Sequence, residues 1–141
     1  MALKAKSLFL YGFQVNEFNN KLDFKSASGG PIKTASLTLG FYSLRSLATE
    51  VALRMADADP AHDYEVLVNR NVSGGTENRV TIHSTGTYLS LLFNPNIIDG
   101  RSSASCSALL GFPPLDRTGA TSYTGTSSAG TSLITHMVGF N

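Results

Sequence analysis

The three histidines and the single cysteine are the side chains of this sequence best suited to metal binding. A metal site needs several imidazole, thiolate or carboxylate ligands at a spacing that lets them converge on one ion. His62, His83 and His136 stand far apart, and none is paired with Cys106 at such a spacing. The acidic stretch Asp57–Asp63 lacks the sharp-turn glycine and the terminal glutamate of a calcium loop. The sequence therefore predicts no metal site.

Cys106 is also the candidate nucleophile, in a segment expected to form a short helical turn from Ser102 to Leu110 and to end at Gly111. A cysteine at a helix N-terminus beside a histidine can be activated. A lone cysteine among serine, alanine and leucine is more typical of a small packed hydrophobe. The G-x-S-x-G elbow of serine hydrolases is absent. We therefore expect no catalytic residue here.

Two glycine pairs, Gly29-Gly30 and Gly74-Gly75, could suggest phosphate loops. Each lies between two expected strands, whereas a phosphate cradle opens a helix. Hairpin turns are the better interpretation. The sequence thus predicts no cofactor, no small-molecule substrate and no enzymatic activity.

Charged residues make up only 15% of the chain and the formal net charge is +1, whereas Ser, Thr, Gly and Asn fill 52 of 141 positions (17, 13, 13 and 9). A specific nucleic-acid binder is disfavoured, because so small a charge releases few counterions. No apolar run approaches the roughly 20 residues that span a bilayer. The first residues do not resemble a signal peptide. These features predict one soluble β-rich domain over residues 1–141, made and used without passing through a secretory channel.

Aromatic, β-branched and alternating residues predict strands over 7–15, 22–27 and 32–39, with a hairpin through Ser28–Pro31. Further strands are expected at 64–69, 79–83 and 88–93, the first two joined by the Gly74-Gly75 turn. A last strand is expected over 132–138.

One amphipathic helix is expected from Leu44 to Ala58, because its apolar residues recur with a period near 3.6. Ser43 is the expected N-cap, and Asp59-Pro60 the expected stop. A single apolar stripe of this kind packs across one face of a sheet. The fold class is therefore α+β, mainly an antiparallel β-sheet or sandwich with one helix packed on it.

The stretch 113–131 is long, nearly uncharged and rich in Gly, Ser, Thr and Ala, so we expect an extended C-terminal arm or loop that reaches away from the core. Interface cores are depleted in charge. The candidate interface residues of this arm are Arg117, Thr118, Thr121, Tyr123 and Thr124.

Four stretches of the chain resemble the virion structural proteins of tailed bacteriophages. They are Leu10–Phe13 with Leu22–Phe24, Gly40–Ser43 with the following helix, Asn78–Ile82 with Leu89–Phe93, and Leu109–Phe112 with Asp116–Gly125.

The resemblance implies a non-enzymatic subunit of the virion, assembled in the host cytoplasm, whose partners are copies of itself and other phage proteins. A tail, neck or baseplate component is the first interpretation, and a capsid decoration or cement protein is the alternative. A carbohydrate-binding module is a third, which the absence of tryptophan disfavours.

Overall fold

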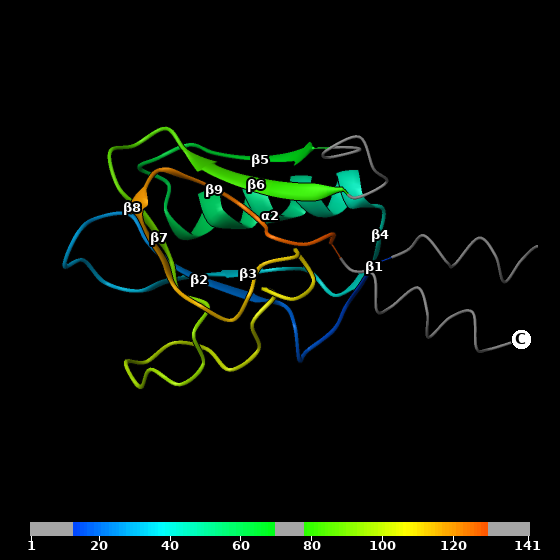
Figure 1. Cartoon of the computed structure of the whole chain (residues 1–141), viewed down its shortest axis with the longest axis horizontal. Coiled ribbons are helices and arrows are strands. Elements are labelled where there is room, and N and C mark those ends of the chain that lie inside the picture. The colour runs from blue at the N-terminus through cyan, green and yellow to red at the C-terminus, as the bar shows by residue number, and fades with distance from the viewer. Residues whose placement is uncertain (1–12, 70–77, 130–141) are drawn as a thin grey trace, which may run out of the picture.

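Three antiparallel β-sheets and one helix form the part of the chain that the structure describes, residues 13–69 and 78–129 of a computed structural model (Figure 1). The predicted class is confirmed: the fold is α+β and mainly sheet. The expected strand over 132–138 and most of that over 7–15 lie outside the described residues, as does the Gly74-Gly75 turn.

The first layer is a four-stranded sheet with the order β3-β2-β7-β8. Its strands are β2 at Lys21–Lys25, β3 at Lys33–Ser36, β7 at Leu89–Leu91 and β8 at Arg117–Ala120. The expected hairpin is present, since β2 pairs antiparallel with β3 in the register Leu22↔Ala35. Leu22 and Ala35 share a face and are fully buried, so this register turns the apolar side of the hairpin into the core.

The second layer has the order β5-β6-β9, with β5 at Tyr64–Asn69, β6 at Arg79–Ser84 and β9 at Ser122–Thr124. β6 alternates regularly, and its Val80, Ile82 and Ser84 are buried. A separate two-stranded ribbon pairs β1 (Phe13–Val15) with β4 (Gly40–Tyr42).

The helix α2 covers Leu44–Ala58, the bounds that the sequence predicts. Ser43 is its N-cap, and the Ser43 hydroxyl accepts a hydrogen bond from the backbone N–H of Ser46 at 3.1 Å. The helix contacts β3 of one sheet and β5 of the other, both of them edge strands. It therefore packs against both sheets and links them on one side of the core.

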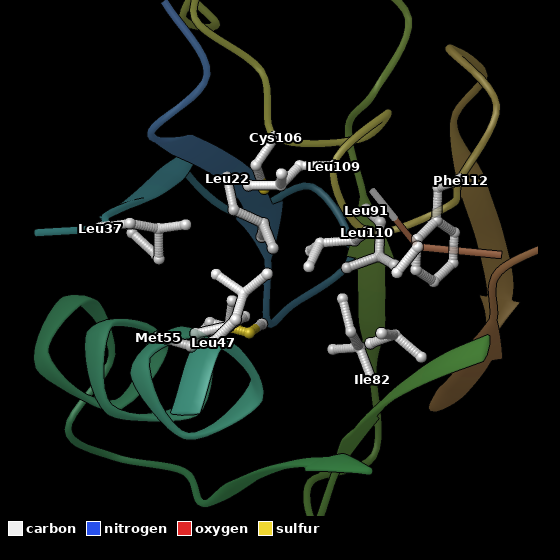
Figure 2. Close-up of a cluster of buried hydrophobic side chains, with 14 of the residues drawn as sticks. Leu22, Leu37, Leu47, Met55, Ile82, Leu91, Cys106, Leu109, Leu110 and Phe112 are labelled. Carbon is white, nitrogen blue, oxygen red and sulfur yellow. The ribbon is translucent and has the colours of Figure 1, made fainter. Parts of the chain in front are cut away.

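The hydrophobic core fills the space enclosed by the two sheets and the helix (Figure 2). Leu47 and Met55 enter it from α2, Leu22 from β2 and Ile82 from β6. Leu110, from the turn that ends at Gly111, is also fully buried among them. Because every layer contributes to one buried cluster, the sheets and the helix are stabilised together.

The expectation of an arm over 113–131 is wrong for its described part, residues 113–129. β8 pairs with β7, and β9 pairs with β6, so this stretch joins the two sheets at a corner. Tyr123 is buried there, accepts a hydrogen bond from the Ala120 N–H at 2.9 Å and donates to the Leu89 carbonyl at 2.7 Å. The sequence did not predict these two strand pairings, because the paired strands are far apart in the chain. Short strands of Ser, Thr and Gly also lack the β-branched and aromatic residues that are typical of strands.

The expected helical turn at 102–110 is reduced to a single turn, with a hydrogen bond from the Leu110 N–H to the Cys106 carbonyl at 3.1 Å. Just before this turn, Ser105 forms a parallel bridge with Lys21 of β2. Because residues 104–106 form backbone hydrogen bonds with Lys21, they do not form a helix.

Gly111 closes this turn as predicted, in the left-handed region with φ +81°. A Cβ there would lie 2.3 Å from the carbonyl oxygen of Ser127, whereas a Cβ at Gly100, with φ +94°, would meet nothing within 4 Å. Both alanine variants strain the backbone by ~1 kcal/mol. We expect Gly111→Ala to lose about 3 kcal/mol in all, because it must also displace the Ser127 backbone. Urea unfolding of the two variants checks this, and equal losses would contradict it.

Candidate interaction surface

The five candidate interface residues do not lie together on one surface. Tyr123 belongs to the core. Arg117 is half-buried, with its guanidinium carbon 5.7 Å from the centre of the Phe112 ring and 5.6 Å from that of Tyr123. Both side chains thus hold the corner between the sheets. Thr118 is exposed on β8, and Thr121 is half-buried between the two strands.

Thr124 lies on the outer side of the β5-β6-β9 sheet, opposite to the core. In this sheet Leu67 stands across from Thr81, and Thr81 stands across from Thr124, so the three side chains form one row. Asn69 joins the row, because its amide donates to the Thr81 hydroxyl at 2.6 Å. We call Leu67, Asn69, Thr81 and Thr124 the neutral face.

The polar groups of the neutral face bond to one another. The hydroxyl oxygens of Thr81 and Thr124 are 2.7 Å apart, so a continuous row of side-chain hydrogen bonds runs from Asn69 through Thr81 to Thr124. Burying a polar group costs free energy mainly when it loses its partner. A second protein surface can therefore dehydrate the centre of this face at little cost, while Leu67, half of which is exposed, gains apolar contact.

Charged side chains border the neutral face at its two ends. Glu65 and His83 stand opposite each other, with His83 Nε2 4.0 Å from a carboxylate oxygen of Glu65. Arg79 lies at the other end, opposite Asn69. A neutral centre with a charged border has the arrangement of a protein–protein interface.

A second ordered surface feature is the loop 94–101 after β7, which we call the anchored loop. Arg101, with a side chain only 6% exposed, holds it by hydrogen bonds to Asp99 at 2.8 Å and to Asp116 at 2.7 Å. The guanidinium also donates to the Asn94 carbonyl at 3.0 Å. Against the opposing effect of burial, the bond to Asp99 raises the pKa of Arg101 above its ordinary value. Ile98 is fully exposed in this loop.

Large apolar side chains are exposed on several ordered elements of the described chain: Phe18, Leu39, Phe41, Leu53, Leu67, Ile97, Ile98 and Leu115. Single exposed hydrophobes are ordinary on a soluble surface. Phe41 lies on β4, whereas Leu39 lies in the bend just before that strand.

An ionisable cluster surrounds Asp59, the C-cap of α2. Its buried carboxylate accepts hydrogen bonds from Lys33 Nζ at 2.7 Å, His62 Nδ1 at 2.8 Å and the Tyr64 hydroxyl at 2.5 Å. Burial opposes ionisation, but the bonds from Lys33, Tyr64 and His62 outweigh it and hold the pKa of Asp59 below its ordinary range. The cluster ties β3, α2 and β5 together, so its evident task is structural.

Cys106 is completely buried, and burial raises the pKa of its thiol to about 12. The thiol is therefore protonated near neutral pH and packs as an apolar group. Among residues 13–69 and 78–129, no three His, Cys, Asp or Glu side chains lie together as a metal site would require. In the same residues no helix is long and apolar enough to cross a membrane.

The chain matches no family model, and a search of curated proteins finds no match.

Sequence reasoning named Thr124 but missed Thr81, Leu67 and the anchored loop. The alternation of β5 carried a signal, because Leu67 falls out of phase with Val66 and Val68, which pack against the core. The pair Ile97-Ile98 also lies between turn-forming Asn94–Asn96 and Asp99-Gly100, where burial is not expected.

Proposed function

We propose that the chain is a non-enzymatic structural subunit of a tailed-phage virion, a tail, neck or baseplate component that associates with copies of itself and with other particle proteins. The observation that carries this proposal is the neutral face, where a half-exposed leucine lies beside hydroxyl and amide groups already bonded to one another. The resemblance to virion structural proteins supplies the context of the particle.

The described ionisable clusters fit this role. The carboxylate of Asp59 and the guanidinium of Arg101 bond to groups that hold the chain's own elements together. A stable framework that presents a surface with few charges suits repeated contacts between copies.

The experiment that tests self-association places a lysine on the neutral face. Thr124→Lys is expected to weaken self-association at least about tenfold, because the added ammonium loses its hydration when the face is covered. Sedimentation velocity over a concentration series measures the effect. The matched control is Thr49→Lys, which adds the same charge at an exposed position of α2.

A wild-type chain that stays monomeric at every concentration would contradict self-association, and equal association of the two lysine variants would contradict the neutral face as its site. The copy number of the chain in purified particles separates a tail or neck component from a capsid decoration protein, which would be present in a larger number.

A further inference from the structure

The anchored loop contains the pair Asp99-Gly100, in which an aspartate directly precedes a glycine. Nowhere else in the sequence does an aspartate or an asparagine stand before a glycine. At such a pair the aspartate side chain can react with the backbone, because glycine has no side chain to hinder the approach. Both residues are exposed, so water reaches them.

The reaction is an intramolecular condensation. The backbone nitrogen of Gly100 attacks the side-chain carboxyl carbon of Asp99 and forms a new C–N bond. The carboxyl hydroxyl leaves as water together with the amide proton, and the product is a succinimide ring. Water then adds to either ring carbonyl and breaks the C–N bond of that carbonyl. One opening restores aspartate, and the other gives isoaspartate, in which the main chain runs through the side-chain carboxyl carbon.

The conformation of the anchored loop places the reacting groups beside each other. A carboxylate oxygen of Asp99 accepts a hydrogen bond from the backbone N–H of Arg101 at 3.3 Å, so the side chain folds forward past the Gly100 peptide group. Gly100 has φ +94°, which glycine adopts without strain, and a Cβ there would meet nothing within 4 Å. No neighbouring group therefore packs against Gly100.

The guanidinium of Arg101 opposes the reaction, because it holds the carboxylate in its ionised form. Its Nε donates to one carboxylate oxygen of Asp99 at 2.8 Å, and a terminal nitrogen donates to the other at 2.8 Å. These bonds hold the pKa of Asp99 below its ordinary value. Only the neutral carboxyl group has a hydroxyl that can leave as water, and the ionised form is a poor acceptor of the nitrogen lone pair.

Arg101 is itself fixed by the rest of the anchored loop. Its other terminal nitrogen donates to Asp116 at 2.7 Å and to the Asn94 carbonyl at 3.0 Å, and its side chain is only 6% exposed. A bidentate contact between a guanidinium and a carboxylate has a defined geometry and is stronger than a neutral hydrogen bond. The contact to Asp99 is therefore in place before the carboxyl group can move toward the Gly100 nitrogen.

We propose that Asp99-Gly100 is a latent site of spontaneous isoaspartate formation, and that the bidentate contact of Arg101 keeps it unreactive in the folded protein. Isoaspartate at position 99 would lengthen the main chain and move the carboxylate away from Arg101, so the anchored loop would lose one of the carboxylates that hold it. This inference does not depend on the proposed function, because it concerns the chemistry of the loop alone.

Incubation of the purified protein at neutral pH tests the proposal. Methylation by an isoaspartate methyltransferase measures the product, and peptide mapping with electron-transfer fragmentation assigns its position. Arg101→Gln is expected to form isoaspartate at position 99 at least about tenfold faster than the wild type, because an adjacent cation favours the ionised carboxylate. Arg101→Lys is expected to be intermediate, since it keeps the charge without the planar, bidentate group.

Asp116→Asn is the matched control for loosening of the anchored loop. It removes the other carboxylate that pairs with Arg101 but leaves the contact to Asp99 in place, so a rate near that of the wild type is expected. Asp63 is an internal control in every sample. It is also exposed, but it precedes Tyr64 and is expected to stay unmodified.

Arg101→Gln that forms isoaspartate at position 99 no faster than the wild type would overturn the proposal. Equal acceleration by Asp116→Asn would overturn it too, because the rate would then depend on loosening of the loop and not on the ion pair. Circular dichroism checks that each variant folds. If Arg101→Gln does not fold, Arg101→Lys decides the question, and a rate equal to that of the wild type then overturns the proposal.

Discussion

Replacing Asp59 with alanine is expected to lower the free energy of unfolding by about 3–5 kcal/mol, the usual cost of removing one partner from a buried ion pair. The carboxylate bonds to three side chains from β3, β5 and the loop between α2 and β5. Its loss leaves Lys33 and the hydroxyl of Tyr64 without their acceptor. Urea unfolding followed by circular dichroism measures the change.

The neighbouring Asp57 provides the matched control. It also pairs with a cation, Arg54 at 2.7 Å, but its side chain is 64% exposed. Exposed pairs of this kind contribute little, so Asp57→Ala is expected to cost less than about 1 kcal/mol. A similar loss for the two variants would show that the buried network of Asp59 is not a main source of stability.

The same network predicts a loss of stability in acid. The folded state holds the pKa of Asp59 below the ordinary value of an aspartate, so the unfolded chain binds a proton first as the pH falls. The contribution of Asp59 is therefore complete near neutral pH and declines as the pH falls below the ordinary value of about 4. Asp59→Asn is expected to lack this part of the acid dependence.

Replacing Val51 with aspartate is expected to prevent folding altogether. Val51 lies on the inner side of α2, with no exposed surface, among the apolar residues of the core. A carboxylate there would be buried without a charged partner, at a cost of several kcal/mol, which approaches the whole stability of a small domain. Circular dichroism and the dispersion of an NMR spectrum check the result.

Leu53→Asp is the control for this substitution. Leu53 lies two residues further along the same helix, and half of its side chain is exposed, so the same carboxylate stays hydrated. We expect a folded protein that loses less than about 1 kcal/mol. Equal damage from the two substitutions would mean that α2 does not face the core along the stripe that contains Val51.

The helix could be predicted from the sequence because its information is local. The apolar stripe that includes Leu47, Val51 and Met55 and the cap at Ser43 all lie within or next to the element that they define. The hairpin of β2 and β3 is local in the same sense, since its turn lies between its strands.

The candidate interaction surface could be predicted only in part. Composition indicated a surface with few charges, and Thr124 does lie on the neutral face. Its partner Thr81 is far away in the sequence, and nothing in the order of residues brings the two hydroxyls together. Tyr123, one residue before Thr124, was expected at an interface but is a core residue, because alternation on β9 points it inward.

The sequence by itself determined that this chain is an α+β domain with one amphipathic helix and a low charge content, because these features follow from composition and local periodicity. Only the tertiary structure decided that the stretch after Asp116 joins two sheets and that Ile98 and Phe41 stay exposed. The physical reason is that strand pairing and burial depend on contacts between residues distant in the sequence. A pattern of short Gly, Ser and Thr segments does not encode such contacts.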